Sequence, residues 1–247
     1  MASTAVDEWA ESNRKYHDSV VPDYESIVRP DWLPDGVFRF RETVRSLIEK
    51  VPRGARILEI GPGSGDFCRE LVSLGFRNIH AVDVSPSMIS QVLSETDKVC
   101  GVAGDATRLP YQNEAFDFIN VKGCLHHISD IGCAISEICR CLKPEGLFRL
   151  QEPNASSFLV EPVPDPTLER PLNLVDVERI LFDVGLSVDI SKTFLHFSFA
   201  RLLADQGLDK QTMNAVIDAL NPVFDKARQG EIFLIVGHKS DVAKPFC

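Results

Sequence analysis

Residues 57–66 read Ile-Leu-Glu-Ile-Gly-Pro-Gly-Ser-Gly-Asp, and this stretch decides the fold. An apolar run is followed by glycine at three alternate positions and then by helix-compatible residues 67–74, an order that predicts strand, tight turn and helix. Glycine has no Cβ, so the turn can adopt positive φ and a ligand can lie directly against the peptide. Free N–H groups at the start of the next helix favour an anionic group. The stretch therefore predicts a ligand-binding turn.

A dinucleotide is one candidate for that ligand, because nicotinamide and flavin enzymes place G-x-G-x-x-G in the same turn. Such a fingerprint starting at Gly61 needs glycine at position 66, where this chain has Asp66. The Asp66 carboxylate would repel a pyrophosphate. The turn therefore favours a ligand with a carboxylate and a cation but no phosphate. A strand-to-helix turn without a ligand is the alternative.

The segment from Glu59 to Gly65 resembles motif I, E/D-x-G-x-G-x-G, of the class I S-adenosylmethionine (SAM)-dependent methyltransferases, and in particular the type 11-like enzymes that act on small molecules. The resemblance implies SAM as the cofactor and S-adenosylhomocysteine as its product. It also implies that Glu59 holds the ammonium of SAM through water, while the turn cradles the methionine end. The turn residues concerned are Gly61, Pro62, Gly63 and Gly65.

Two further acids follow later predicted strands. Asp83 ends the strand at 79–82, where a carboxylate can accept hydrogen bonds from both ribose hydroxyls. NAD enzymes share this acid, so Asp83 indicates adenosine binding rather than SAM alone. Residues 104–110 and 116–119 resemble the methyltransferase pattern G-D-A-x-x-L-P followed by F-D-x-I. The resemblance implies that Asp105 accepts a hydrogen bond from the adenine amino group, and a surface aspartate is the alternative. It places around the adenine Val84, Met88, Gly104 and the backbone amide of Ala106.

The segment after the fourth predicted strand, residues 122–130, begins with Lys122 and Gly123. Ligands of open α/β sheets lie outside the carboxyl ends of the strands, so this segment should line the cofactor and its transferred methyl group. Histidine is the natural base near neutral pH. His126 matches the histidine of the similar L-H-D-W-S-D run in plant small-molecule O-methyltransferases, which implies that it removes the acceptor proton. His127 is the second candidate, and a structural histidine is the alternative for both.

Regular alternation of strand and helix patterns predicts a parallel sheet with right-handed crossovers. Together with the resemblance, this gives an α/β fold: a Rossmann-like, seven-stranded, mostly parallel sheet with flanking helices. We predict an N-terminal helical arm over 1–52 and a SAM-binding domain over 53–247, with a helical insertion at about 198–228. The arm resembles the tyrosine-bearing helix that folds over the cofactor in related enzymes. We therefore expect Tyr16 and Tyr24 at the cofactor, with aromatic packing as the alternative.

Several boundaries are predicted more closely. The arm should contain helices at about 4–28 and 37–51. Residues 143–146, Lys-Pro-Glu-Gly, predict a helix stop before a strand at 147–151. In the family the last two strands form an antiparallel hairpin, which the insertion should interrupt here.

The 247-residue chain has a net charge of -10, which would repel a polyanion, so we expect no nucleic-acid partner. Its sequence has no apolar run of transmembrane length, so we expect no membrane partner and a cytoplasmic location. Seven cysteines without C-x-x-C spacing fit a reducing compartment and argue against a metal site. The expected partner is a small-molecule methyl acceptor, and a homodimer is left open.

The combined motifs predict a SAM-dependent methyltransferase that acts on a small molecule, with O-methylation favoured because of His126. Fold does not fix function, so a SAM-binding regulatory subunit that transfers no methyl group is the alternative. A nicotinamide oxidoreductase is a third class, which binding of NADH without binding of SAM would indicate.

Overall fold

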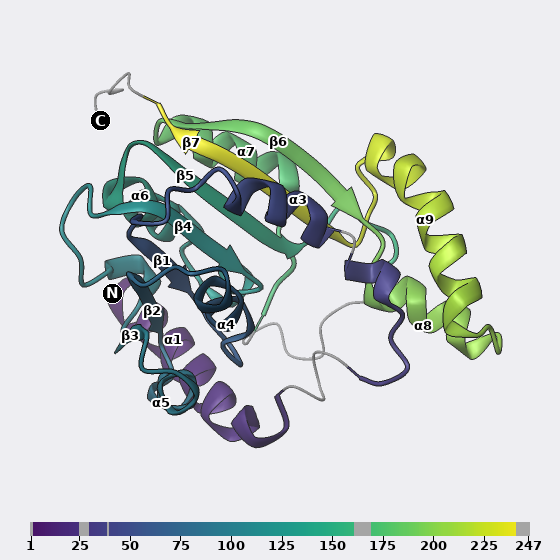
Figure 1. The fold of residues 1–247 in the computed structure, drawn as a ribbon, viewed down its shortest axis with the longest axis horizontal. Coiled ribbons are helices and arrows are strands. Elements are labelled where there is room, and N and C mark those ends of the chain that lie inside the picture. Colours follow the sequence, from purple (N-terminus) through teal and green to yellow (C-terminus); the bar gives the residue numbers. More distant parts are fainter. Residues whose placement is uncertain (1, 25–29, 39, 161–168, 241–247) are drawn as a thin grey trace.

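The computed structural model describes residues 2–24, 30–38, 40–160 and 169–240. Within these residues, seven strands form one sheet in the order β3-β2-β1-β4-β5-β7-β6 (Figure 1). Strand β7 runs antiparallel to both of its neighbours, and the other pairs are parallel. This is the predicted Rossmann-like α/β architecture. The strands are β1 (Ile57–Ile60), β2 (Ile79–Asp83), β3 (Val99–Ala103), β4 (Phe116–Lys122), β5 (Leu142–Pro153), β6 (Leu186–Phe194) and β7 (Ile232–Lys239).

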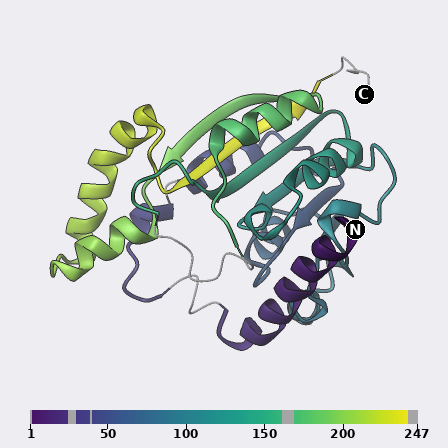
Figure 2. The ribbon, with the colours of Figure 1, turned by 180° about the vertical axis from the view of Figure 1, so that it is seen from behind.

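Helices cover both faces of the sheet, because successive residues of a strand point to opposite faces. Ile57 of β1 belongs to the apolar cluster with α3, α4 and α5, while Leu58 belongs to the cluster with α6 and α7. Figures 1 and 2 show these two helical layers from opposite sides. The core therefore consists of two apolar layers with the sheet between them. The helices are α3 (Phe40–Ile48), α4 (Asp66–Ser73), α5 (Pro86–Glu95), α6 (Ile131–Cys141) and α7 (Leu174–Asp183).

The N-terminal arm begins with α1 (Ala2–Val20), which lies along α5 (Figure 2). This helix is shorter than predicted, and the 3-10 turn η1 (Val21–Asp23) follows it. Pro22 explains the early end, because proline has no N–H to continue the helix and its ring clashes with the preceding turn. The last residues of the predicted helix lie outside the described residues.

Two other boundaries differ from the prediction. The helix expected at 37–51 is divided into the 3-10 turn η2 (Asp35–Phe38) and the shorter α3. Helix α6 ends at Cys141, before the stop predicted at 143–146, but β5 begins at Leu142 rather than at residue 147 and includes that segment. Glu145 has a positive φ of 59°, and the register of β5 against β4 shifts nearby. A bulge of this kind lets the chain pass directly from α6 into the sheet.

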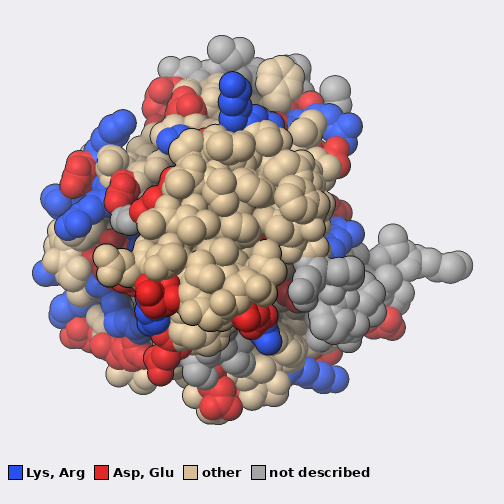
Figure 3. All heavy atoms as spheres, turned by 90° about the vertical axis from the view of Figure 1, so that its right-hand side faces the viewer, with Lys and Arg blue, Asp and Glu red and all other residues tan. Residues whose placement is uncertain are grey.

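Helices α8 (Phe197–Asp205) and α9 (Lys210–Ala227) interrupt the hairpin between β6 and β7, as predicted. They pack around a separate apolar cluster that includes the buried Leu195. Figure 3 looks onto this side of the molecule and shows a broad area without charged side chains. Leu202 of α8 and Val223 of α9 are more than half exposed. Among the described helices, none combines the length and the apolar character needed to cross a membrane.

Candidate active site

The glycine turn between β1 and α4 has positive φ at Gly61, Gly63 and Gly65, of 67°, 54° and 81°. A Cβ on Gly61 would lie 2.6 Å from the Cβ of Cys124, and a Cβ on Gly63 would lie 2.9 Å from the ring of Tyr24. Both distances are well below the 3.5–4.0 Å or so at which carbon atoms pack favourably. Only glycine fits these two positions without movement of a neighbour, so the turn presents bare backbone at the carboxyl end of β1.

A cleft lies beside this turn, at the carboxyl ends of β1 to β4, and α1 forms one wall of it. Most of the predicted cofactor residues line the cleft, together with His127: they are Tyr24, Gly61, Gly63, Asp83, Val84, Met88, Gly104, Asp105, Ala106 and Gly123. Five other predicted residues line an adjoining cavity: they are Tyr16, Glu59, Pro62, Lys122 and His126. Gly65 is the N-cap of α4, where an added Cβ would face Val92.

Asp83 and Asp105 each use one carboxylate oxygen within their own turn. Asp83 Oδ1 accepts a hydrogen bond from the backbone N–H of Ser85 at 2.8 Å. Asp105 Oδ1 accepts from the N–H and the hydroxyl of Thr107, both at 2.8 Å. Within the described residues the second oxygen of each acid has no hydrogen-bond partner, so it is available to a ligand in the cleft. Burial raises the pKa of Asp83 to about 6, which still leaves it mostly ionised at neutral pH.

Glu59 belongs to a buried polar network beneath the glycine turn. Asn120 of β4 donates from Nδ2 to Glu59 at 2.6 Å. Arg149 of β5 donates to Oδ1 of Asn120 at 2.8 Å and also to Gln151. Burial raises the pKa of Glu59 to about 8 and lowers the pKa of Arg149 to about 10. Asn120 and Arg149 were not among the predicted site residues, although polar residues within otherwise apolar strands are a signal of such a network.

Helix α1 is attached across the cleft by two side-chain hydrogen bonds, one near its middle and one near its C-terminal end. Trp9 Nε1 donates to the carbonyl oxygen of His127 at 2.6 Å. Nearer the end of the helix, Ser85 Oγ donates to Asp18 Oδ1 at 2.5 Å. Sequence reasoning placed Tyr24 here but missed Trp9 and Asp18. Their partners are 118 and 67 positions away, so no local pattern indicated them.

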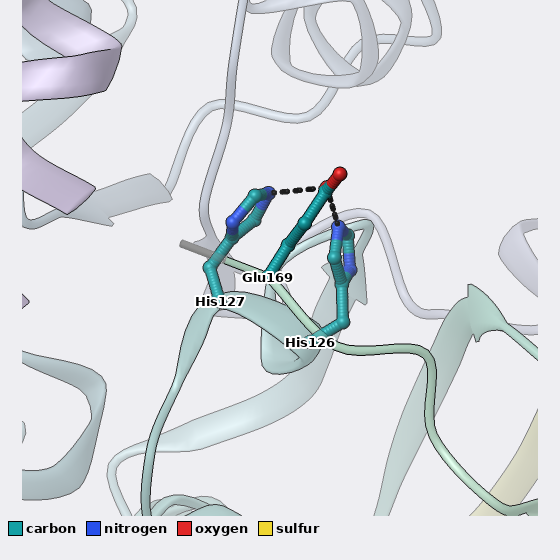
Figure 4. A group of neighbouring side chains, drawn as sticks. All are labelled: His126, His127 and Glu169. Atoms are coloured by element: carbon teal, nitrogen blue, oxygen red, sulfur yellow. Dashed lines mark ion pairs between the residues drawn. The ribbon is translucent and has the colours of Figure 1, made fainter. Parts of the chain in front are cut away.

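His126 is held between two carboxylates. Its Nδ1 lies 2.7 Å from Oε2 of Glu152, and its Nε2 lies 3.5 Å from Oε2 of Glu169. Glu152 also accepts backbone N–H groups from the turn that carries His126, which fixes the carboxylate. Burial alone would lower the pKa of His126, but hydrogen bonds to both acids raise it to about 9. His127 Nε2 lies 4.0 Å from the same Glu169 oxygen, and Figure 4 shows the Glu169 carboxylate between the two rings.

The adjoining cavity has a volume of about 440 Å³. Small-molecule sites typically measure roughly 300–1,000 Å³. His126, Lys122 and His196 line it, and burial lowers the pKa of Lys122 to about 8 and that of His196 to about 4. Gly63 and Tyr24 line both the cleft and this cavity, so the two spaces join beside the glycine turn.

The sheet order, the glycine turn and the acids after β2 and β3 define a Rossmann-like fold with a cleft at the carboxyl ends of its strands. Residues 58–150 match the family profile described as a methyltransferase domain. Residues 58–150 therefore carry a methyltransferase domain, which agrees with the predicted class I SAM-dependent family.

Several known proteins are similar to this chain, and the similarity covers different shares of its length. A demethylmenaquinone methyltransferase from Renibacterium salmoninarum is 27% identical over 159 residues, which are 64% of this chain and 65% of that protein, a little less than two thirds. The structure of a Haloferax volcanii methyltransferase, solved in complex with the Trm112 methyltransferase activator, superposes on this chain with a TM-score of 0.65 at 19% sequence identity. The superposition covers 91% of this chain and 97% of the Haloferax volcanii chain. The structure of the [4+2]-cyclase SpnF superposes with a TM-score of 0.66 at 20% sequence identity, and the superposition covers 92% of this chain and 94% of SpnF. These two structures support the fold alone.

Proposed function

We propose that the chain transfers a methyl group from SAM to a small molecule, with a hydroxyl as the acceptor. The observation that supports this most is the junction between the cleft and the adjoining cavity at Gly63 and Tyr24. A cofactor in the cleft and an acceptor in the cavity would meet there. Holding two reactants in line in this way supplies much of the rate enhancement of a displacement reaction.

The cleft residues fit SAM. Asp83 has an oxygen available for the ribose hydroxyls, and Asp105 has one for the adenine amino group. The bare backbone at Gly61 and Gly63 leaves room for the methionine end, and Glu59 lies beneath it to hold the ammonium. SAM would supply a methyl group bonded to a positively charged sulfur, which is a good leaving group. The protein's task is to position both partners and to remove the proton of a hydroxyl acceptor.

His126 is the base that we propose. Glu152 holds its Nδ1, so its Nε2 is directed toward Glu169 and the cavity. Neutral His126 can take a hydroxyl proton on Nε2, and Glu152 would stabilise the imidazolium that forms. Since the pKa of His126 is about 9, its neutral form becomes more abundant as the pH rises from 7 to 9.

A regulatory role without turnover is the second candidate. The similarity to the Haloferax volcanii methyltransferase, which was solved with an activator protein, favours a protein partner for this chain. The chain would then bind SAM and a protein partner but transfer no methyl group by itself. The cytoplasmic location, the boundary at residue 52 and a homodimer stay predictions beside both candidates.

The test is turnover. Purified protein is incubated with SAM and a panel of phenols, alcohols, amines and quinols, and S-adenosylhomocysteine is quantified. We expect formation that depends on a hydroxyl acceptor and falls strongly in His126→Ala. Binding of SAM without turnover, with a protein that copurifies, would favour the regulatory role. Binding of NADH but not of SAM would contradict both.

A further inference from the structure

Three potential metal ligands meet at the edge of the acceptor cavity. His126, His127 and Glu169 each direct one ligand atom to the same space, and these atoms all lie within 4.8 Å of one another (Figure 4). Glu169 is 42 positions beyond His127, so the fold brings it to the histidine pair. Cysteine spacing argued against a metal site in the sequence, and no local spacing joins Glu169 to the two histidines.

The distances between the ligand atoms are close to those around a small divalent ion. Zinc bonds to histidine nitrogen and carboxylate oxygen are about 2.0–2.2 Å long, so two ligands of a tetrahedral ion lie about 3.4 Å apart. Glu169 Oε2 is 3.5 Å from His126 Nε2 and 4.0 Å from His127 Nε2. The third pair, the two histidine ligand atoms, lies within 4.8 Å, so the histidine rings must approach each other by up to about 1.4 Å to complete the geometry. Movement of Glu169 alone does not change this separation.

Glu152 supplies the support that metal-binding histidines usually have. Such a histidine donates its other ring N–H to a carboxylate, which fixes the ring and makes the ligand nitrogen more basic. His126 Nδ1 lies 2.7 Å from the buried Glu152, whose side chain is fully inaccessible. This contact places the Nδ1 proton toward Glu152 and directs the lone pair of Nε2 toward Glu169. An ion pair between His126 and Glu169 alone would not require His127 to point at the same oxygen.

We propose that His126, His127 and Glu169 bind a divalent first-row transition metal ion of the Zn²⁺ class. Two imidazoles and one carboxylate suit such ions, whereas Mg²⁺ and Ca²⁺ prefer oxygen ligands. Three protein ligands leave a coordination position open to the cavity, where an acceptor oxygen can bind. That last role rests on the proposed function, but the metal site itself does not. The metal would bind Nε2 of His126, the nitrogen that we propose as the base in the metal-free protein.

The test is calorimetric titration of the metal-free protein with ZnCl₂, followed by elemental analysis after desalting. We expect one Zn²⁺ per chain and an affinity at least tenfold lower in Glu169→Gln and in His127→Gln. His238→Gln is the matched control, because His238 pairs with Asp189 at 2.9 Å but lies away from the cavity. Its affinity should change less than twofold. Circular dichroism verifies that each variant is folded.

Two results would overturn the metal site. One is the lack of saturable Zn²⁺ binding by the wild-type protein. The other is equal binding by Glu169→Gln and His127→Gln, as would follow if cysteines held the ion. Failure of the proposed function has a different outcome: Zn²⁺ binds as expected, while no acceptor yields S-adenosylhomocysteine with or without the metal.

Discussion

Replacing Glu59 with glutamine should stabilise the cofactor-free protein and weaken its binding of SAM. Glu59 is 2% exposed, and burial raises its pKa from 4.5 to about 8. Glutamine keeps the shape and keeps an oxygen that can accept from Asn120, but it carries no charge at any pH. The substitution therefore removes the ionisation of residue 59 while preserving most of its contacts.

The size of the effect follows from linkage. Between pH 4.5 and 8 the folded state keeps a proton on Glu59 that the unfolded state releases, so the free energy of unfolding falls as the pH rises through this window. Each pH unit is worth about 1.4 kcal/mol. At pH 7 the wild type should be less stable than Glu59→Gln by roughly 3 kcal/mol, and at pH 5 by less than about 1 kcal/mol.

Urea unfolding at pH 5, 7 and 9 measures this difference, with the exposed Glu49→Gln as the matched control. The stability difference between Glu59→Gln and wild type should grow from pH 5 to about pH 8 and then level off. At pH 9, where Glu59 is ionised, SAM affinity should fall about tenfold, or about 1.4 kcal/mol, because the ammonium loses its anionic partner. A stability difference that stays constant with pH would refute the buried-carboxylate reasoning, and unchanged SAM affinity would refute its role in the site.

Three other substitutions test the remaining parts of the site. Asp83→Ala should weaken SAM binding by about 1.5–3 kcal/mol in calorimetry, whereas the control Asp97→Ala, at an exposed position, should leave it unchanged. The SAM affinity of the wild-type protein should also decline as the pH falls below about 6, because Asp83 becomes protonated. Unchanged affinity in Asp83→Ala would count against the ribose assignment. Trp9→Phe removes the hydrogen bond to the carbonyl of residue 127 and should speed SAM dissociation in stopped-flow measurements; an unaltered rate would mean that the arm does not close the cleft. His126→Ala should lower turnover at least a hundredfold with SAM affinity within a few fold, and full activity across pH would place the base elsewhere.

The cleft beside the glycine turn was predictable because the residues that line it follow local rules. Apolar periodicity located the strands, and the glycines at alternate positions located the turn after β1. Since the carboxyl ends of parallel strands meet at one edge, Asp83 and Asp105 had to lie near that turn. Here the strand pattern, the glycine spacing and the family resemblance together led from the sequence to the candidate site.

The arm and the histidine environment were less predictable, because their contacts join distant parts of the chain. Trp9 bonds to the backbone of residue 127, and that carbonyl has no sequence signature. Glu152 belongs to β5, and its contact with His126 depends on the turn that follows β4. Glu169 lies in an irregular connection where no periodicity applies. Side-chain partners of this kind become visible only once the fold has been built.

The crystal structure of the complex with S-adenosylhomocysteine is the most direct measurement of the central claim. We predict the ribose hydroxyls at the free oxygen of Asp83, the adenine amino group at Asp105, and the amino-acid end against Gly61 and Gly63. An empty cleft at saturating ligand, or the ligand bound at another place in the chain, would contradict the account.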